Sequence, residues 1–243
     1  MKTKLFITNL FLLVIVSRVG MGQMNFNCFV TNSTDEEPLL SGELFEPAMT
    51  PNIVTYFNKE WLSGDIWLTN GRIIRNKKIK YNGLLDELFW LEPESNQTIK
   101  LDKEAILRFH FFNFQGDTTI RFRKLKVKQD IFNDSSEIFV QEIDQGNLSL
   151  LISHSFYFAG KEAVRTKKSY YLKDVYKEEP VYYLSFHDNR LIKFRRFSRK
   201  NLCTSLPDKK DLIQEYFRDS ASGKIKTDQE ILDFVQYLSS IVD

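Results

Sequence analysis

The feature that most constrains the fold lies at residues 61–91, where two Asn-Gly dipeptides separate short apolar runs. Asn-Gly between apolar runs is the strongest short-range signal of a β-hairpin, because a type I′ turn needs positive φ at both central residues. Asn70-Gly71 and Asn82-Gly83 therefore predict turns between strands at residues 65–68, 72–74, 77–81 and 84–91. The last strand is apolar at four consecutive positions, which is typical of a central strand covered on both faces.

Similar runs continue to residue 197 and predict about ten short strands in a β-domain of residues 53–197. The run at residues 118–128 changes parity, because Phe122 belongs to one alternation and Leu125 to the other. This change predicts a β-bulge near Arg123-Lys124. The fold class that follows is mainly β (α+β), an antiparallel meander that forms a roll, sandwich or barrel.

Residues 198–243 change to helical periodicity. Thr227 and Glu230 have the spacing of a capping box, and apolar residues that include Phe234 and Leu238 follow at helical intervals. We predict a C-terminal pair of α-helices. Because short helices are marginal alone, we expect this segment to pack on the β-domain, with Phe234 and Leu238 buried.

The first 22 residues have the pattern of a signal peptide: a basic start, an apolar run and the small-residue cleavage site Gly20-Met21-Gly22. The apolar run is shorter than the roughly 20 residues that span a bilayer, so we expect cleavage and no transmembrane anchor in the mature chain. Residues 23–52 are polar and interrupted by prolines, which predicts an extended leader arm. The expected location is periplasmic, cell-surface or secreted.

Net charge gives no indication of nucleic acid as a partner. Three of the 34 basic residues lie in the first 22 positions, so the remaining chain carries 31 basic and 32 acidic side chains. Nucleic-acid binding depends on a basic surface excess that this balance does not provide. We therefore expect an exported or cell-envelope partner, no nucleic acid and no cofactor, with the oligomeric state open.

Basic residues concentrate at positions 161–200, which hold 12 basic and 5 acidic side chains. The candidate ligand-binding residues are four closely spaced basic residues of this stretch and one tryptophan that can stack on a ligand: Arg190, Lys193, Arg195, Arg196 and Trp67. The alternative is that the basic stretch pairs internally with acidic segments or forms a solvated face.

The common catalytic motifs are absent from the sequence, including GxxxxGK[ST], GxGxxG, GxSxG, HExxH and CxxC. His110, His154 and His187 lie on separate predicted strands or turns, where structural roles are commoner than metal binding. Asp86 and Glu87 are adjacent in the predicted central strand, so they point to opposite faces and cannot act together. We predict neither catalytic residues nor a metal site.

The two cysteines, Cys28 and Cys203, lie at opposite ends of the β-rich region. Export permits a disulfide between them, which would join the leader arm to the helical segment. Two buried thiols are the alternative, because the sequence does not place their Cα atoms within bridging range.

Three stretches carry a resemblance to a known group: GDIWLTNGRIIRNKKIKYNGLLDELFWL, EIFVQEIDQGNLSLL and KTDQEILDFVQYLSSI. They resemble the uncharacterised secreted β-rich proteins common in Bacteroidetes-type bacteria. The resemblance implies export and a β-rich body with a helical tail, but no activity. The function that we predict is an exported, non-catalytic binding or interaction module. The alternatives are a β-barrel carrier of a small apolar ligand and, third, a glycoside-hydrolase-type enzyme.

Overall fold

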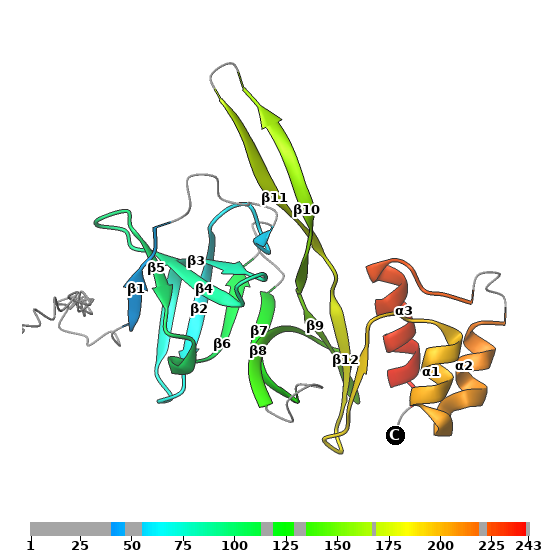
Figure 1. The fold of residues 1–243 in the computed structure, drawn as a ribbon. Helices are drawn as coiled ribbons and strands as arrows, with labels where there is room; N and C mark the ends of the chain where they lie inside the picture. The colour runs from blue at the N-terminus through cyan, green and yellow to red at the C-terminus, as the bar shows by residue number, and fades with distance from the viewer. Residues whose placement is uncertain are drawn as a thin grey trace, which may run out of the picture.

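A computed structural model of the chain describes residues 40–46, 55–112, 119–128, 135–166, 169–218 and 223–241. The predicted signal peptide, residues 1–22, and Cys28 lie outside these residues, as does most of the predicted leader arm. The described part consists of one large sheet, a two-stranded arm that stands away from it, and helices gathered at the C-terminal end (Figure 1).

All strand pairings are antiparallel, and the main sheet has the order β1-β5-β4-β3-β2-β6-β7-β8-β9-β12-β13. Its strands are β1 (Gly42–Leu44), β2 (Leu62–Leu68), β3 (Ile73–Asn82), β4 (Glu87–Leu91), β5 (Thr98–Leu101), β6 (Ile106–Phe112), β7 (Thr119–Lys128), β8 (Ser135–Asp144), β9 (Leu148–Ser153), β12 (Val181–Phe186) and β13 (Leu191–Phe194). The arm consists of β10 (Phe156–Arg165) and β11 (Tyr170–Glu178). The predicted mainly β, antiparallel class is confirmed, and in the described residues the sheet is not closed into a barrel.

The described residues contain three α-helices near the C-terminus: α1 (Arg199–Ser205), α2 (Lys210–Tyr216) and α3 (Asp228–Ser239). The predicted pair is present as α2 and α3, and α1 precedes it. Short 3-10 helices form at Lys103–Ala105 (η2) and Pro207–Lys209 (η3). The predicted capping box is present, because Thr227 and Glu230 bind each other's backbone at the start of α3. Within the described residues, no helix combines the length and the apolar character needed to cross a membrane.

Two of the predicted strands, at residues 72–74 and 77–81, are one strand, β3. The interruption is local: Asn76 has φ of 49°, and its amide donates to Asp65 Oδ1 at 2.8 Å. The pairing of β2 with β3 shifts register at the same point, between Gly64 and Ile66. A β-bulge therefore explains the polar break that the sequence presents as a turn.

The strand predicted at residues 84–91 begins only at Glu87, because the turn after β3 is longer than two residues. Asn82 Oδ1 accepts from the amides of Leu84 and Leu85, at 3.0 and 3.2 Å. The strand itself, β4, lies between β3 and β5, and its three middle residues 88–90 are all buried. Its predicted central position is confirmed.

The bulge predicted near Arg123-Lys124 is wrong, because β7 pairs with β8 in a register without a shift from Arg121 to Lys128. The parity change has another cause. Phe122 and Leu125 are three residues apart on a regular strand, so they face opposite sides of the sheet and are buried in different cores.

Three hydrophobic cores flank the sheet. The first core is built on β2 to β8 and is rich in aromatic rings, with Phe109 stacked on Phe122 at 4.8 Å and Phe139 edge-on to Phe109 at 5.1 Å. The second core joins β9, β12 and β13 to the three helices. A small third core occupies the opposite face. Phe234 and Leu238 of α3 are fully buried in the second core, as predicted.

Asp86 connects three separate parts of the β-domain. It accepts from the hydroxyl of Tyr81 at 2.7 Å and from the amide of Phe139 at 3.1 Å, and pairs with Lys103 Nζ at 2.5 Å. Burial of Tyr81, and secondarily the charge and hydrogen bond of Asp86, raise the pKa of that phenol well above its usual value, so it remains a donor. The prediction that Asp86 lies in the central strand is wrong, because Asp86 lies in the turn before β4, with φ of 54°. Its contacts give it a structural role.

We predict that Asp86→Ala lowers the free energy of unfolding by about 2–4 kcal/mol, because it leaves the buried Tyr81 hydroxyl and the Phe139 amide without their acceptor. Asp86→Asn retains one acceptor oxygen and should cost about half as much. Chemical denaturation of the two variants measures the difference. A loss for Asp86→Ala no greater than that for Asp86→Asn would contradict this role.

Candidate functional site

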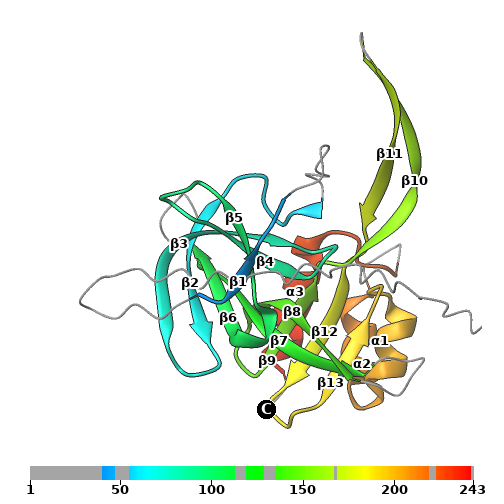
Figure 2. The ribbon, with the colours of Figure 1, turned by 60° about the vertical axis from the view of Figure 1, so that its left-hand side comes forward.

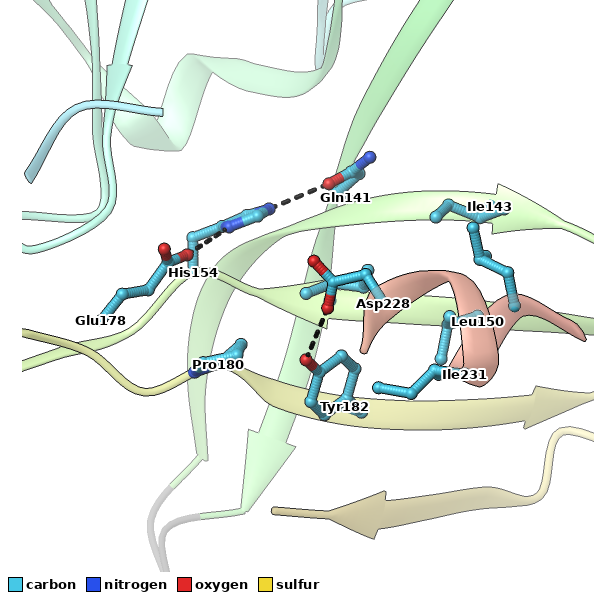
Figure 3. A pocket seen from close by; sticks show the side chains of 11 residues that line it. Gln141, Ile143, Leu150, His154, Glu178, Pro180, Tyr182, Asp228 and Ile231 are labelled. Atoms are coloured by element: carbon cyan, nitrogen blue, oxygen red, sulfur yellow. Dashed lines mark hydrogen bonds and ion pairs between the residues drawn. The ribbon is translucent and has the colours of Figure 1, made fainter. Parts of the chain in front are cut away.

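A pocket of about 240 Å³ lies between the sheet and the start of α3 (Figure 3). Its aliphatic floor consists of Ile143, Leu150, Ile152, Ile231 and Leu232. Its polar rim consists of Gln141, His154, Glu178, Tyr182 and Asp228, with Pro180 beside them. The site thus combines an apolar base with several hydrogen-bonding groups, which is the usual composition of a small-molecule site.

The sheet register explains why these side chains share a face. Phe122, Gln141, Ile152, Tyr182 and Phe194 are directly opposite one another in successive strands β7, β8, β9, β12 and β13. Residues opposite in an antiparallel sheet point to the same side. The row therefore passes from the first core at Phe122, through the pocket, to the second core at Phe194.

His154 is held by carboxylate, amide and aromatic neighbours. Its Nδ1 lies 2.8 Å from Glu178 Oε1 and its Nε2 lies 2.9 Å from Gln141 Oε1 (Figure 3). A carboxylate only accepts, so Nδ1 carries a proton, and the amide of Gln141 can serve Nε2 as donor or acceptor. The ring also contacts Phe57 and Phe122, with centroids 4.9 and 5.9 Å away. His154 thereby forms the wall between the first core and the pocket.

On the opposite wall, Tyr182 donates its hydroxyl proton to Asp228 Oδ1 at 3.2 Å. Burial raises the pKa of Tyr182 far above its usual value, and the charges of Asp228 and Glu178 add to the effect. The phenol therefore stays protonated and acts as a fixed donor. Asp228 is the first residue of α3, where the helix dipole stabilises its negative charge.

The pocket therefore presents two carboxylates, those of Glu178 and Asp228, beside an aliphatic floor. Within the part of the chain that the structure describes, each accepts one hydrogen bond, and a carboxylate has about four lone-pair positions. The arrangement favours a ligand with a cationic or hydrogen-bond-donating group and an apolar body.

The predicted basic residues lie elsewhere. Arg190 packs on the ring of Phe186 at 4.5 Å and pairs with Asp188 and Asp208, at 3.5 and 3.9 Å. The contact with Asp208 of η3 agrees with the alternative that the basic stretch pairs with acidic segments. Lys193, Arg195 and Arg196 are exposed on or just after β13, and none of the four basic residues lines the pocket.

Trp67 is half-buried and faces the side of the sheet opposite the first core, because Ile66 beside it points into that core. Its ring lies 4.2 Å from the ring of His110 and 4.8 Å from the guanidinium carbon of Arg108. Burial, and then the charges of Arg108 and Arg121, lower the pKa of His110. The tryptophan is thus packed among neighbours and is separate from the pocket.

The three histidines occupy different places. His154 lines the pocket, His110 packs against Trp67, and His187 Nε2 lies 3.2 Å from the carbonyl oxygen of Gly146. Among the described residues, no group of three His, Cys, Asp or Glu side chains could hold a metal ion.

Cys203 is half-buried on α1 and has no disulfide in the described residues. It lines an open, charged groove of about 690 Å³ with other α1 and α2 residues such as Lys200, Lys210 and Glu215. Because Cys28 lies outside the described residues, the bridge between the two cysteines remains a prediction.

Of the pocket's polar residues, sequence reasoning considered only His154, and it favoured a structural role. Gln141, Glu178, Tyr182 and Asp228 come from four separate segments, and no motif connects them. Asp228 is indistinguishable in sequence from an ordinary residue of a capping box. The strand register brings these residues together, and the sequence alone does not determine that register.

Comparison with known proteins adds no further constraint: no family model, curated protein or solved structure matches this chain. The resemblance to secreted Bacteroidetes-type proteins therefore remains a prediction.

Gly83 brings the turn after β3 against the base of the arm. A Cβ at this position would lie 2.2 Å from the backbone oxygen of His154 and 2.9 Å from the ring of Phe156. Such distances are far below van der Waals contact, and the first involves a backbone atom that cannot rotate away. The wall that His154 forms therefore depends on the absence of a side chain at Gly83.

We predict that Gly83→Ala lowers the free energy of unfolding by about 1–3 kcal/mol and shifts the NMR signals of the His154 ring, because the added methyl displaces the His154 backbone. Gly71→Ala is the control: nothing lies within 4 Å of its new Cβ, and its φ of +83° imposes only a conformational cost. Unchanged His154 signals in a folded Gly83→Ala protein would contradict the expected contact.

Proposed function

We propose that this protein is an exported, non-catalytic binding module whose pocket takes a small organic amine with an aliphatic chain. The observation that supports this function is the pairing of two carboxylates, Glu178 and Asp228, with an aliphatic floor in one pocket. An ammonium group has three donors and a positive charge, which complement the remaining acceptor positions of the two carboxylates.

The floor supports the aliphatic part of the ligand. Transfer of each methylene from water to an apolar surface contributes about 0.8 kcal/mol. The volume of about 240 Å³ is below the roughly 300–1,000 Å³ of sites for drug-sized ligands, so the ligand is small. The fixed hydrogen bonds of His154 and Tyr182 hold the carboxylates in place before binding, which reduces the entropic cost.

The two alternatives from sequence receive different support. The carrier with an enclosed barrel interior is disfavoured, because the described sheet is open. The glycoside-hydrolase reading requires two carboxylates in one cleft, and Glu178 and Asp228 meet that requirement, which makes such an enzyme the second candidate. Binding is favoured over hydrolysis because each carboxylate is already engaged by a protein donor.

Export is proposed on the pattern of residues 1–22, and the partner or ligand is accordingly placed in the periplasm, at the cell surface or outside the cell.

We predict that the exported protein begins at Gln23, and intact-mass spectrometry of the exported material measures this. Exported material that retains residues 1–22 would contradict the cleavage.

For the pocket, we predict that hexylammonium binds about tenfold more tightly than hexanol and that hexanoate binds most weakly. The three probes share one apolar chain and differ in head group, so the order reports the sign of the charge in the pocket. Titration calorimetry or NMR titration of the full-length mature chain measures the three dissociation constants.

Asp228→Asn should weaken hexylammonium binding about fivefold and leave hexanol binding nearly unchanged, because only the charged probe loses an ion pair. Asp233→Asn is the matched control, since Asp233 lies on the same helix but not in the pocket. Equal binding of the three probes, or equal effects of the two variants, would refute the proposed amine site.

Release of reducing sugar from a polysaccharide by the wild-type chain, and its loss in Glu178→Gln, would instead favour the glycoside-hydrolase-type enzyme.

A further inference from the structure

The arm formed by β10 and β11 stands away from the body of the protein in two views (Figures 1 and 2). Its strands pair with each other and, in the described residues, with no third strand. A two-stranded hairpin without a hydrophobic face packed on other elements is marginally stable in water. The arm nevertheless carries four large apolar side chains that are 46–68% exposed: Tyr157, Phe158, Tyr170 and Leu172.

The register collects most of this apolar surface on one face. Phe158 pairs with Tyr176, and their ring centroids are 5.8 Å apart. Nearer the tip, Ala163 pairs with Leu172 and Arg165 with Tyr170. These pairs lie at alternate positions of β11, so their side chains point to the same side. We call this side, together with the charged pair between its two apolar parts, the arm face.

The charged pair of the arm face consists of Lys161 and Asp174, whose charged atoms are 3.6 Å apart and whose side chains are 57% and 49% exposed. It lies between the Phe158–Tyr176 pair and the Ala163–Leu172 pair. The arm face therefore has an apolar patch on each side of one positive and one negative charge, and the two charges lie on different strands.

We propose that the arm face binds the arm face of a second copy of this chain, with a two-fold axis parallel to the arms. Such an axis places β10 of one copy over β11 of the other. Three cross-strand pairs of the arm face then become contacts between copies: Lys161 faces the other copy's Asp174, Phe158 faces Tyr176, and Ala163 faces Leu172. A two-fold interface requires this kind of self-complementarity.

Charge selects this arrangement over its alternatives. A two-fold axis across the arms that lays the two apolar patches of one copy on those of the other passes through the charged pair. It then places Lys161 over Lys161 and Asp174 over Asp174, which is repulsive. An anionic lipid surface fits poorly, because the carboxylates of Asp174 and Glu178 on this face balance the charges of Lys161 and Arg165 and leave no basic excess. The parallel two-fold axis satisfies both charges and covers the exposed apolar side chains. The inference goes beyond the proposed ligand binding, since none of the residues in these contacts lines the pocket.

Two variants that each reverse one charge of the Lys161–Asp174 pair test the proposal. Lys161→Asp gives an arm with two acids, and Asp174→Lys gives an arm with two bases. We expect the wild-type chain to dimerise in sedimentation experiments across the micromolar range, and each variant alone to dimerise at least tenfold more weakly. An equimolar mixture of the two variants should form a heterodimer, because each acid then faces a base.

The mixture distinguishes binding between copies from disruption within one arm, since mixing leaves the like charges within each arm unchanged. A second pair of variants tests the orientation in a Cys28→Ser, Cys203→Ser background. Chains with Ala163→Cys should form a disulfide-linked dimer with chains carrying Leu172→Cys, and neither should do so alone.

A wild-type chain that is monomeric throughout this range would overturn the proposal, as would a mixture that associates no better than its components. Binding of the monomer to vesicles of anionic phospholipid, lost in Leu172→Asp, would also overturn it and assign the arm to a membrane surface. At concentrations where the chains are monomeric, all variants should have the same unfolding midpoint as the wild type, because the arm lies outside the three cores.

Discussion

Strands β7, β8, β9 and β12 pair in continuous antiparallel register, and this pairing sets the positions of the pocket and of the two cores beside it. It aligns Phe122, Gln141, Ile152 and Tyr182 in one row on one face of the sheet. The aromatic first core covers one end of this row and the helices cover the other. The pocket is the interval between the two cores, where Gln141 interrupts the apolar row and a polar rim becomes possible.

The same ladder explains where the arm begins. The pairing of β9 with β12 reaches Ser153 and Val181, and the arm starts a few residues beyond. At this junction the amide of Glu179 donates to the carbonyl of Ser155 at 2.8 Å, and Glu178 holds His154 at 2.8 Å. The pocket wall and the base of the arm are therefore built from the same residues.

Local patterns in the sequence identify much of the fold because they report local physics. The apolar run of β4 indicates burial on both faces, and the Thr227–Glu230 box marks the start of α3. Errors arise where a local pattern has two causes. The parity change between Phe122 and Leu125 is typical of a bulge, but it also results when a regular strand is buried on both faces in different cores.

The candidate site is less accessible to prediction, because its residues meet only through long-range pairing. Tyr182 and Asp228 are 46 residues apart, and their hydrogen bond depends on the docking of α3 against the sheet. The basic residues near Arg190 are conspicuous in sequence because they are dense. In the structure the Arg190 charge is met by Asp188 and Asp208, while the pocket is lined by less conspicuous carboxylates.

We propose above that the interval between the two cores binds an apolar amine. The most direct measurement is a methyl NMR titration of the mature chain with hexylammonium. Hexylammonium should shift the methyl signals of Ile143, Ile152, Ile231 and Leu232, while those of Ile74 and Ile79 in the first core stay in place. Saturating hexylammonium that leaves the four pocket residues unshifted, or that shifts methyl groups elsewhere instead, would contradict this proposal.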